Sequence, residues 1–130
     1  MVLDTSAIIA AITNELDGAR YRAAILSAES LLISAPAAFE TKIVLQSRLA
    51  GGVALFDEMI GRAGIVVVPF DEEMVNAAFD AFRRFGKGQG HPAQLNIVDC
   101  AVYALAKTRS QPLLFKGGDF AKTDVAVAPV

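Results

Sequence analysis

The chain alternates between short, wholly apolar runs and longer segments in which apolar residues recur every three or four positions. A short apolar run bounded by turn residues is typical of a strand buried on both faces, whereas the longer spacing is typical of a helix. The pattern predicts strands at residues 2–3, 31–33, 65–68 and 113–115, and a last edge strand at 125–127. It predicts helices at residues 6–12, 18–29, 38–50, 53–62, 71–85 and 96–107.

Polar residues at the boundaries support these elements. Ser6, Asp71 and Asn96 each stand where a helix should begin, and each is a favourable N-cap. Residues 65–68 are all β-branched, which predicts a fully buried strand. Because strands alternate with helices, we expect an α/β fold with a mostly parallel central sheet of four to five short strands flanked by helices. The length favours a single domain over residues 1–130.

Composition narrows the class of protein. The chain is 54% hydrophobic and 20% charged, which argues against disorder. No apolar run reaches the roughly 18 residues of a membrane-spanning helix, and the first residues lack the basic region of a signal peptide. The one cysteine, Cys100, cannot form an internal disulfide. We therefore expect a cytoplasmic protein that makes no use of a membrane.

Charge and histidine content limit the chemistry. The formal net charge is −2, so any action on nucleic acid must depend on a local site rather than on a basic surface. His91 is the only histidine. A histidine-rich zinc site is therefore excluded, and a Ser-His-Asp mechanism would depend on this one imidazole.

Four acidic residues fall where a parallel sheet gathers ligands, outside the carboxyl ends of its strands. Asp4 ends the first strand, Asp119 follows the strand at 113–115, and Glu40 and Asp99 lie in the first turns of predicted helices. Each acid alone also suits a turn or a helix start. Several partly buried carboxylates together, however, repel one another unless a cation or a proton neutralises them. Oxygen-only donors select Mg²⁺ or Mn²⁺, ions that activate water and stabilise charge on a phosphoryl oxygen.

The segments that carry these acids resemble the motifs of VapC toxins, which are ribonucleases of the PIN-domain type. Residues 1–7, 39–41, 95–100 and 113–124 are similar to those motifs in order and spacing, over nearly the whole chain. One departure is Val98, where many members have glycine; the larger side chain removes no ligand. The resemblance implies a three-layer PIN-like fold and a metal-dependent endoribonuclease toxin that uses Mg²⁺ or Mn²⁺. It also implies a homodimer that a cognate VapB-like antitoxin neutralises.

The resemblance assigns roles to individual residues. Asp4, Asp99 and Asp119 would bind the metal directly, while Glu40 would bind a second ion or act through water. Hydrolysis would leave a 5′-phosphate and a 3′-hydroxyl. Side chains expected to orient the carboxylates are Thr5, Ser6, Asn96 and Asp124. Candidate RNA contacts are Lys87 and His91 in the glycine-rich segment 86–92, and Lys116 close to Asp119.

Three other classes of protein share parts of this pattern. A phospho-accepting receiver domain also has an aspartate after a strand and a late Leu-Leu-x-Lys, but it needs an adjacent acidic pair, and no acid adjoins Asp4. A haloacid-dehalogenase-like phosphatase needs Asp-x-Asp, and this chain has Ser6 at the third position. A non-catalytic PIN-like interaction module would keep the fold and use its apolar surface. The presence of all four acids favours the nuclease.

Overall fold

The computed structural model describes residues 1–130, in which short strands alternate with helices. The strands are β1 (Val2–Leu3), β2 (Leu31–Ser34), β3 (Ile65–Val68) and β4 (Leu113–Leu114). The helices are α1 (Thr5–Ile12), α2 (Gly18–Ser27), α3 (Ala35–Arg48), α4 (Gly52–Ala63), α5 (Glu72–Phe85) and α6 (Ile97–Thr108), and a 3₁₀ turn, η1 (Phe120–Lys122), follows β4. None of the helices combines the length and the apolar character that crossing a membrane requires.

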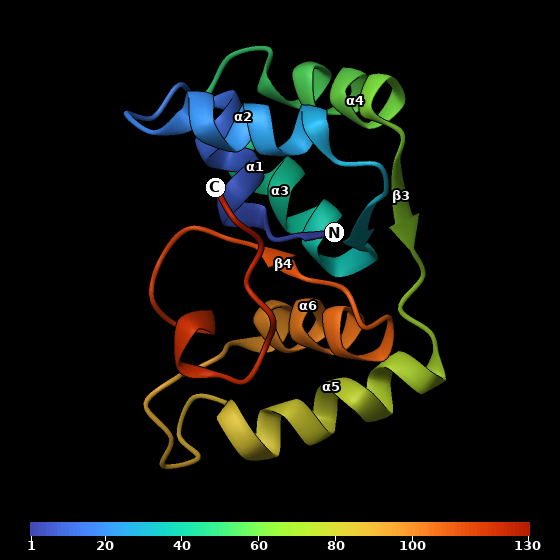
Figure 1. Cartoon of the computed structure of the whole chain (residues 1–130), viewed down its shortest axis with the longest axis vertical. Helices are drawn as coiled ribbons and strands as arrows, with labels where there is room; N and C mark the ends of the chain where they lie inside the picture. The colour runs from blue at the N-terminus through green and yellow to red at the C-terminus, as the bar shows by residue number, and fades with distance from the viewer.

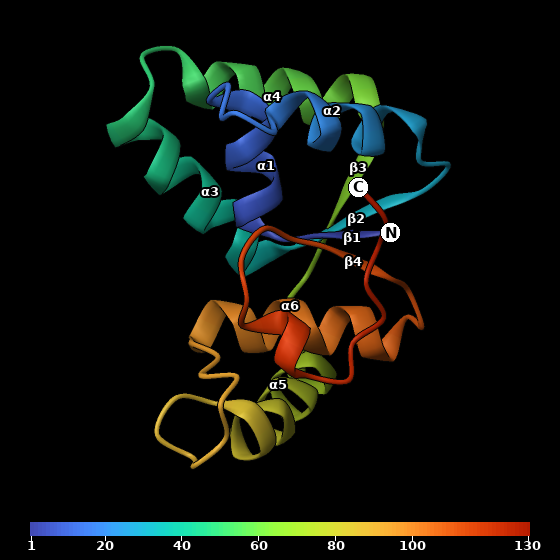
Figure 2. The ribbon, with the colours of Figure 1, turned by 60° about the vertical axis from the view of Figure 1, so that its left-hand side comes forward.

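The four strands form one parallel sheet in the order β3-β2-β1-β4. Helices α1, α2 and α4 lie on one side of the sheet, and α5 and α6 lie on the other (Figures 1 and 2). Helix α3 contacts α1 and α4 and also reaches α6. The α/β class and the three layers are thus the predicted ones. Because β1 sits between β2 and β4, the first and last strands of the chain are neighbours.

The core holds the ends of β1 and α6 in fixed positions. Helix α6 is buried along its length from Cys100 to Ala106, between the sheet and α5. Its alanines, including Ala101 and Ala104, allow neighbouring elements to approach closely. Val2 and Leu3 of β1 are completely buried beside it. The residue that follows β1 and the first turn of α6 are therefore rigidly placed.

Two of the corrected helix starts bear on the acidic residues. Asp4, not Ser6, is the N-cap of α1: its carboxylate accepts a hydrogen bond from the Ser6 backbone N–H at 3.0 Å. Helix α3 begins at Ala35, three residues before the predicted start, because Pro36 stands in its first turn. Proline is tolerated there, since the first N–H groups of a helix have no intrahelical acceptor.

Two strand predictions need correction. Residues 65–68 form β3, but Val66 and Val67 are 55% and 41% exposed, so the strand is not fully buried. Successive side chains point to opposite faces, so both faces of the sheet are open at this edge. Residues 125–127 form no strand; Val127 makes a single bridge to Leu113, flanked by hydrogen bonds of 2.8 and 2.9 Å. The sheet therefore has four strands, the lower of the two numbers predicted.

Candidate metal centre

A cavity of about 470 Å³ opens at the carboxyl ends of β1 and β4. The four predicted acids all line it, although they come from distant parts of the chain. Asp4 follows β1, Asp99 is in the first turn of α6, and Asp119 lies between β4 and η1. Glu40 comes from the second turn of α3 rather than the first, since the helix begins at Ala35. The fold thus brings together the four residues that the sequence singled out.

Asp4 is the most buried of these acids, with 6% of its surface exposed. Its Oδ2 accepts hydrogen bonds from the backbone N–H and the hydroxyl of Ser6. The Ser6 hydroxyl in turn accepts a hydrogen bond of 2.9 Å from the backbone N–H of Lys116. Burial raises the pKa of Asp4, and hydrogen bonds from Ser6 and the Thr5 backbone partly oppose this. Ser6 therefore links the carboxylate after β1 to the segment after β4.

Asp99 is held by a capping box at the start of α6. Its Oδ2 accepts from the Asn96 backbone N–H at 3.0 Å, and its own N–H donates to Asn96 Oδ1 at 2.8 Å. Burial raises the pKa of Asp99 to about 6, a hydrogen bond from Asn96 opposes the rise, and the charges of Asp4, Glu40 and Asp119 add to it. The other three carboxylates are thus close enough to disfavour the ionised form of Asp99.

The donor chemistry of this cavity fits a hard cation. In the conformation of the structure, no three acidic, histidine or cysteine side chains stand close enough to enclose an ion. The four carboxylates nevertheless face one cavity without a histidine or thiolate among its lining residues. A divalent cation there would offset the burial of Asp99 and relieve the repulsion that adds to the rise of its pKa. Oxygen-only donors favour Mg²⁺ or Mn²⁺ over zinc.

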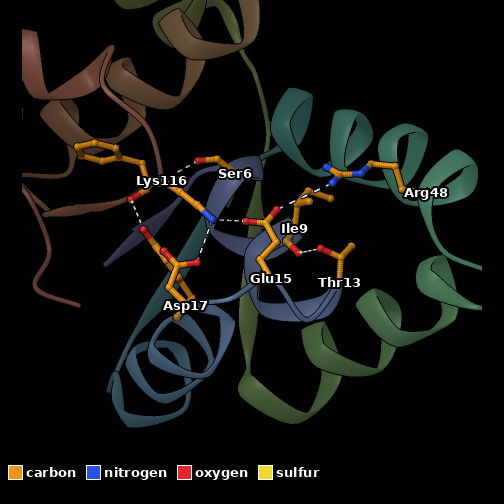
Figure 3. A network of polar contacts seen from close by, with 9 residues as sticks. Ser6, Ile9, Thr13, Glu15, Asp17, Arg48 and Lys116 are labelled. Carbon is orange, nitrogen blue, oxygen red and sulfur yellow. Dashed lines mark hydrogen bonds and ion pairs between the residues drawn. The ribbon is translucent and has the colours of Figure 1, made fainter.

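Lys116 lines the cavity, but its ammonium group is already paired. Nζ donates to Asp17 Oδ1 at 2.9 Å and makes a close contact with Glu15 Oε2 (Figure 3). Glu15 also faces Arg48, whose Nη2 lies 4.0 Å from Glu15 Oε1. Glu15 and Arg48 are lining residues that the sequence analysis missed. Arg48 stands eight residues after Glu40, a spacing that keeps both on one face of a helix and could have identified it.

The structure places three of the remaining candidates outside the cavity. His91 packs edge-on against Phe85 with ring centroids 4.9 Å apart, and its Nδ1 accepts from the Ala93 N–H. Lys87 is exposed on the same loop. The position of these two residues removes the geometric support for direct RNA contacts beside the acids.

Asp124 does not orient the carboxylates as expected. It accepts a hydrogen bond from the Tyr103 hydroxyl and forms ion pairs with Arg84 and Lys107 at 3.3 and 3.4 Å. The hydrogen bond from Tyr103 is the largest of the effects that lower the pKa of Asp124. This carboxylate therefore fastens the C-terminal segment to α5 and α6.

The Thr5 side chain also has a different role from the expected one. Its hydroxyl donates to the Ala37 carbonyl at 3.2 Å and accepts from the Thr41 hydroxyl at 3.2 Å. It thus joins α1 to α3, the two helices that carry Asp4 and Glu40 at or near their starts. Thr5 acts on Asp4 through its backbone N–H and not through its side chain.

Comparison with known proteins gives a consistent result. A family model described as PIN domain matches residues 1–126. Ribonuclease VapC28 of Mycobacterium tuberculosis is 44% identical over 126 residues, which cover 96% of this chain and 95% of that protein. The crystal structure of M. tuberculosis VapC20, a sarcin-ricin loop cleaving toxin, superposes with a TM-score of 0.75 at 15% identity, covering 98% of this chain and 97% of the other. A toxin-antitoxin complex from Klebsiella pneumoniae contains a chain with a TM-score of 0.73 at 14% identity, covering 99% and 97% of the two chains. At these identities the two structures show a shared fold.

Proposed function

The chain belongs to the VapC ribonucleases of the PIN-domain family, and from this premise we propose that it hydrolyses RNA at the four-acid cavity with the aid of Mg²⁺ or Mn²⁺. One observation carries the proposal. Asp4, Glu40, Asp99 and Asp119 line one cavity; burial raises the pKa of Asp99, and the charges of the other three add to the rise. Burial removes hydration from Asp4 and Asp99, and neighbouring carboxylates repel one another, so the arrangement favours a cation that neutralises them.

The acids would divide the work of binding. Asp4, Asp99 and Asp119 would bind the ion directly, and Glu40 would bind a second ion or act through water. Neither Glu40 nor Asp119 makes an ion pair within the protein, so neither carboxylate is committed to another cationic partner. When bound, the cation would supply Lewis acidity, which lowers the pKa of water and stabilises charge on a phosphoryl oxygen.

Other residues would keep the carboxylates in place. Ser6 directs Oδ2 of Asp4 through two hydrogen bonds, and the Asn96 backbone N–H holds Oδ2 of Asp99. Such supporting hydrogen bonds fix the orientation of metal ligands and reduce the cost of assembling the site. The attacking water and the scissile phosphate would enter through the open side of the cavity.

A second hollow suggests where an antitoxin would bind. A groove of about 460 Å³ runs between α1, α2 and α4, and most of its lining is apolar. Leu26 and Leu55, 76% and 47% exposed, line it together with Ile12 and Met59. Exposed apolar grooves of this kind accept amphipathic segments of a partner. The groove shares no lining residue with the acidic cavity. An antitoxin segment bound there would inhibit cleavage either by extending to the cavity or by acting from a distance.

Cleavage of a panel of small structured RNAs, with Mg²⁺ or Mn²⁺ and with EDTA, tests the nuclease proposal. Asp4→Asn, purified in parallel, controls for contaminating nucleases. Asparagine is also a good N-cap, so α1 should still form in this variant. We expect the parent protein to cut at least one RNA and the variant to lose nearly all activity. Cleavage that survives EDTA, or parent-like cleavage by Asp4→Asn, would contradict the mechanism.

A further inference from the structure

Two cationic side chains line the acidic cavity, and they share one carboxylate. Lys116 contacts Glu15 Oε2, while Arg48 Nη2 lies 4.0 Å from Glu15 Oε1 (Figure 3). Every other charged side chain that lines the cavity is acidic. An RNA entering this cavity brings more negative charge, and the net charge of −2 offers no general attraction. The two cations are therefore the groups available to contact its phosphates, and their surroundings distinguish them.

Lys116 is committed to the protein. Its ammonium is held by Glu15 and by Asp17 Oδ1 at 2.9 Å, and these hydrogen bonds raise its pKa. Its backbone N–H also donates to Ser6, which holds Asp4. A cation between two carboxylates is already neutralised, so binding a phosphate would require breaking an existing pair. Lys116 is thus a positioning residue that connects the loop after α1 to the segment after β4.

Arg48 is far less committed. Its side chain is 52% exposed and its one ionic contact, to Glu15, is at the 4.0 Å limit of an ion pair. The guanidinium group has five N–H donors and suits bidentate binding of phosphate. In contrast to the ammonium of Lys116, it can turn toward a ligand without losing a close hydrogen bond.

The position of Arg48 on α3 indicates which phosphate it would meet. Glu40, Val44 and Arg48 follow one another at four-residue intervals, and all three line the cavity. At 1.5 Å per residue, Arg48 stands roughly 12 Å along the helix axis from Glu40. The backbone of Arg48 is therefore displaced along α3 from Glu40, so its guanidinium is placed to meet a phosphate beside the one at the acids.

We propose that Arg48 binds a backbone phosphate of the RNA that flanks the scissile bond, exchanging its long contact with Glu15 for that phosphate. This inference rests on the proposed ribonuclease function. It predicts a residue that governs binding of the substrate rather than the chemical step. It also makes Glu15 a competitor of the RNA for the same guanidinium group.

The first test compares Arg48→Gln with Arg83→Gln, using the RNA that the parent protein cuts. Arg83 is a matched control, since it is an exposed arginine in the last turn of its own helix, α5, away from the cavity. We expect Arg48→Gln to raise KM about tenfold, as for a lost charge-assisted hydrogen bond, and to leave kcat within about a factor of two. The slope of log(kcat/KM) against log salt concentration should become shallower by about 0.7, the value for one contact to a single strand. Arg83→Gln should change none of these quantities.

Arg48→Lys separates charge from geometry. Lysine keeps the positive charge but lacks the planar fork. We expect this variant to retain the parental salt slope and to recover part of the lost affinity. Thermal melts of each variant would identify any failure to fold. If Arg48→Gln does not fold, Arg48→Lys serves in its place: a raised KM with an unchanged salt slope in that variant would support the proposal.

Glu15→Gln should have the opposite effect. Without the competing carboxylate, KM should fall, and the fall should exceed that of Glu29→Gln, which removes the same charge from an exposed position outside the cavity. Because Glu15 also holds Lys116, the double variant Glu15→Gln/Arg48→Gln is needed. If Arg48 is the group released, the double variant should show no gain in affinity over Arg48→Gln.

The outcomes separate this inference from the proposed function. If the parent protein cuts no RNA, the proposed function fails and this inference fails with it. If the parent cuts RNA while Arg48→Gln and Arg83→Gln behave alike, only the role of Arg48 is overturned. A loss confined to kcat would also overturn it, because it would place Arg48 at the chemical step. A gain in affinity that persists in the double variant would transfer the role to Lys116.

Discussion

Asp119 and Asp124 are close in sequence but lie in different surroundings. Asp119 lines the acidic cavity, whereas Asp124 is paired with Tyr103, Arg84 and Lys107. We expect Asp119→Asn to abolish metal-dependent cleavage while the protein stays folded. Asp124→Asn should keep most of the activity and lose about 0.5–1 kcal/mol of stability, since its ion pairs are half exposed. Calorimetric titration with Mn²⁺ and a thermal melt of each variant would measure both effects. Loss of metal binding in Asp124→Asn alone would reverse this assignment.

The raised pKa of Asp99 makes the stability of the metal-free protein depend on pH. Between about pH 4 and pH 6, folded Asp99 keeps a proton that the unfolded chain releases, because its pKa rises from 3.8 to about 6. The free energy of unfolding should therefore decrease as pH rises through this window. The full shift corresponds to about 3 kcal/mol, and solvent screening of this partly exposed group reduces the contribution to about 1–2 kcal/mol.

Thermal melts in EDTA at about pH 5 and about pH 7.5 would test this dependence. The Asp99→Asn variant has no titratable group at position 99. Its stability should therefore change less between the two pH values than that of the parent protein. Mg²⁺ should restore stability to the parent at the higher pH, since the ion neutralises the repelling carboxylates. An identical pH dependence in parent and variant would show that Asp99 is not the group responsible.

At the scale of elements, α6 couples stability to the candidate metal centre through its capping box. Asn96→Ala should cost about 1 kcal/mol, as for other lost N-caps, and should also weaken Mn²⁺ binding because it disturbs the box that holds Asp99. Asp71→Ala is a matched control. Asp71 caps α5 by accepting from the Met74 N–H at 3.0 Å, but it does not line the cavity. The Asp71→Ala variant should therefore lower the melting temperature about as much as Asn96→Ala and leave Mn²⁺ affinity unchanged. Equal losses of Mn²⁺ affinity in both variants would contradict the coupling.

What the sequence could predict about these elements depended on local signals. The starts of α5 and α6 were predicted because Asp71 and Asn96 act through their own neighbouring backbone. The exposure of Val66 was not predicted. It follows from the place of β3 at the edge of the sheet, and no local pattern records the order of strands. The four acids were predicted from strand ends and family-like motifs. Glu15 was missed because it reaches the cavity on a loop, with no periodic pattern to mark it.

At the scale of the whole molecule, the apolar groove and the acidic cavity are separate surfaces, so they can be disabled separately. Leu55→Asp should greatly weaken inhibition by the antitoxin, because it places a carboxylate in an apolar groove. Val75→Asp makes a comparable change at a position of similar exposure on α5. It should remain inhibited like the parent protein. Inhibition constants for RNA cleavage, measured with the cognate antitoxin, would test this prediction. If the antitoxin inhibits Leu55→Asp as strongly as the parent protein, its binding site lies outside the groove.

The assembly of the molecule provides another prediction. By resemblance to its family we expect a homodimer, with a mass near twice 13.7 kDa in light scattering. The exposed apolar side chains outside the groove, among them Phe39 and Phe79, are available for such a contact. A monomer at tens of micromolar would count against the dimer and would leave the fold and the cavity as described.

The order in which the chain is made has a consequence for the cell that makes it. Residues 11–63 supply the whole lining of the apolar groove, whereas the acidic cavity is incomplete until Asp119 has been added. A ribosome translating this chain therefore synthesises every residue of the groove well before it synthesises the last acid of the cavity. We expect an antitoxin to be able to dock on the nascent chain before a functional active site exists. If the antitoxin binds at that point, the newly synthesised toxin is never both unbound and active.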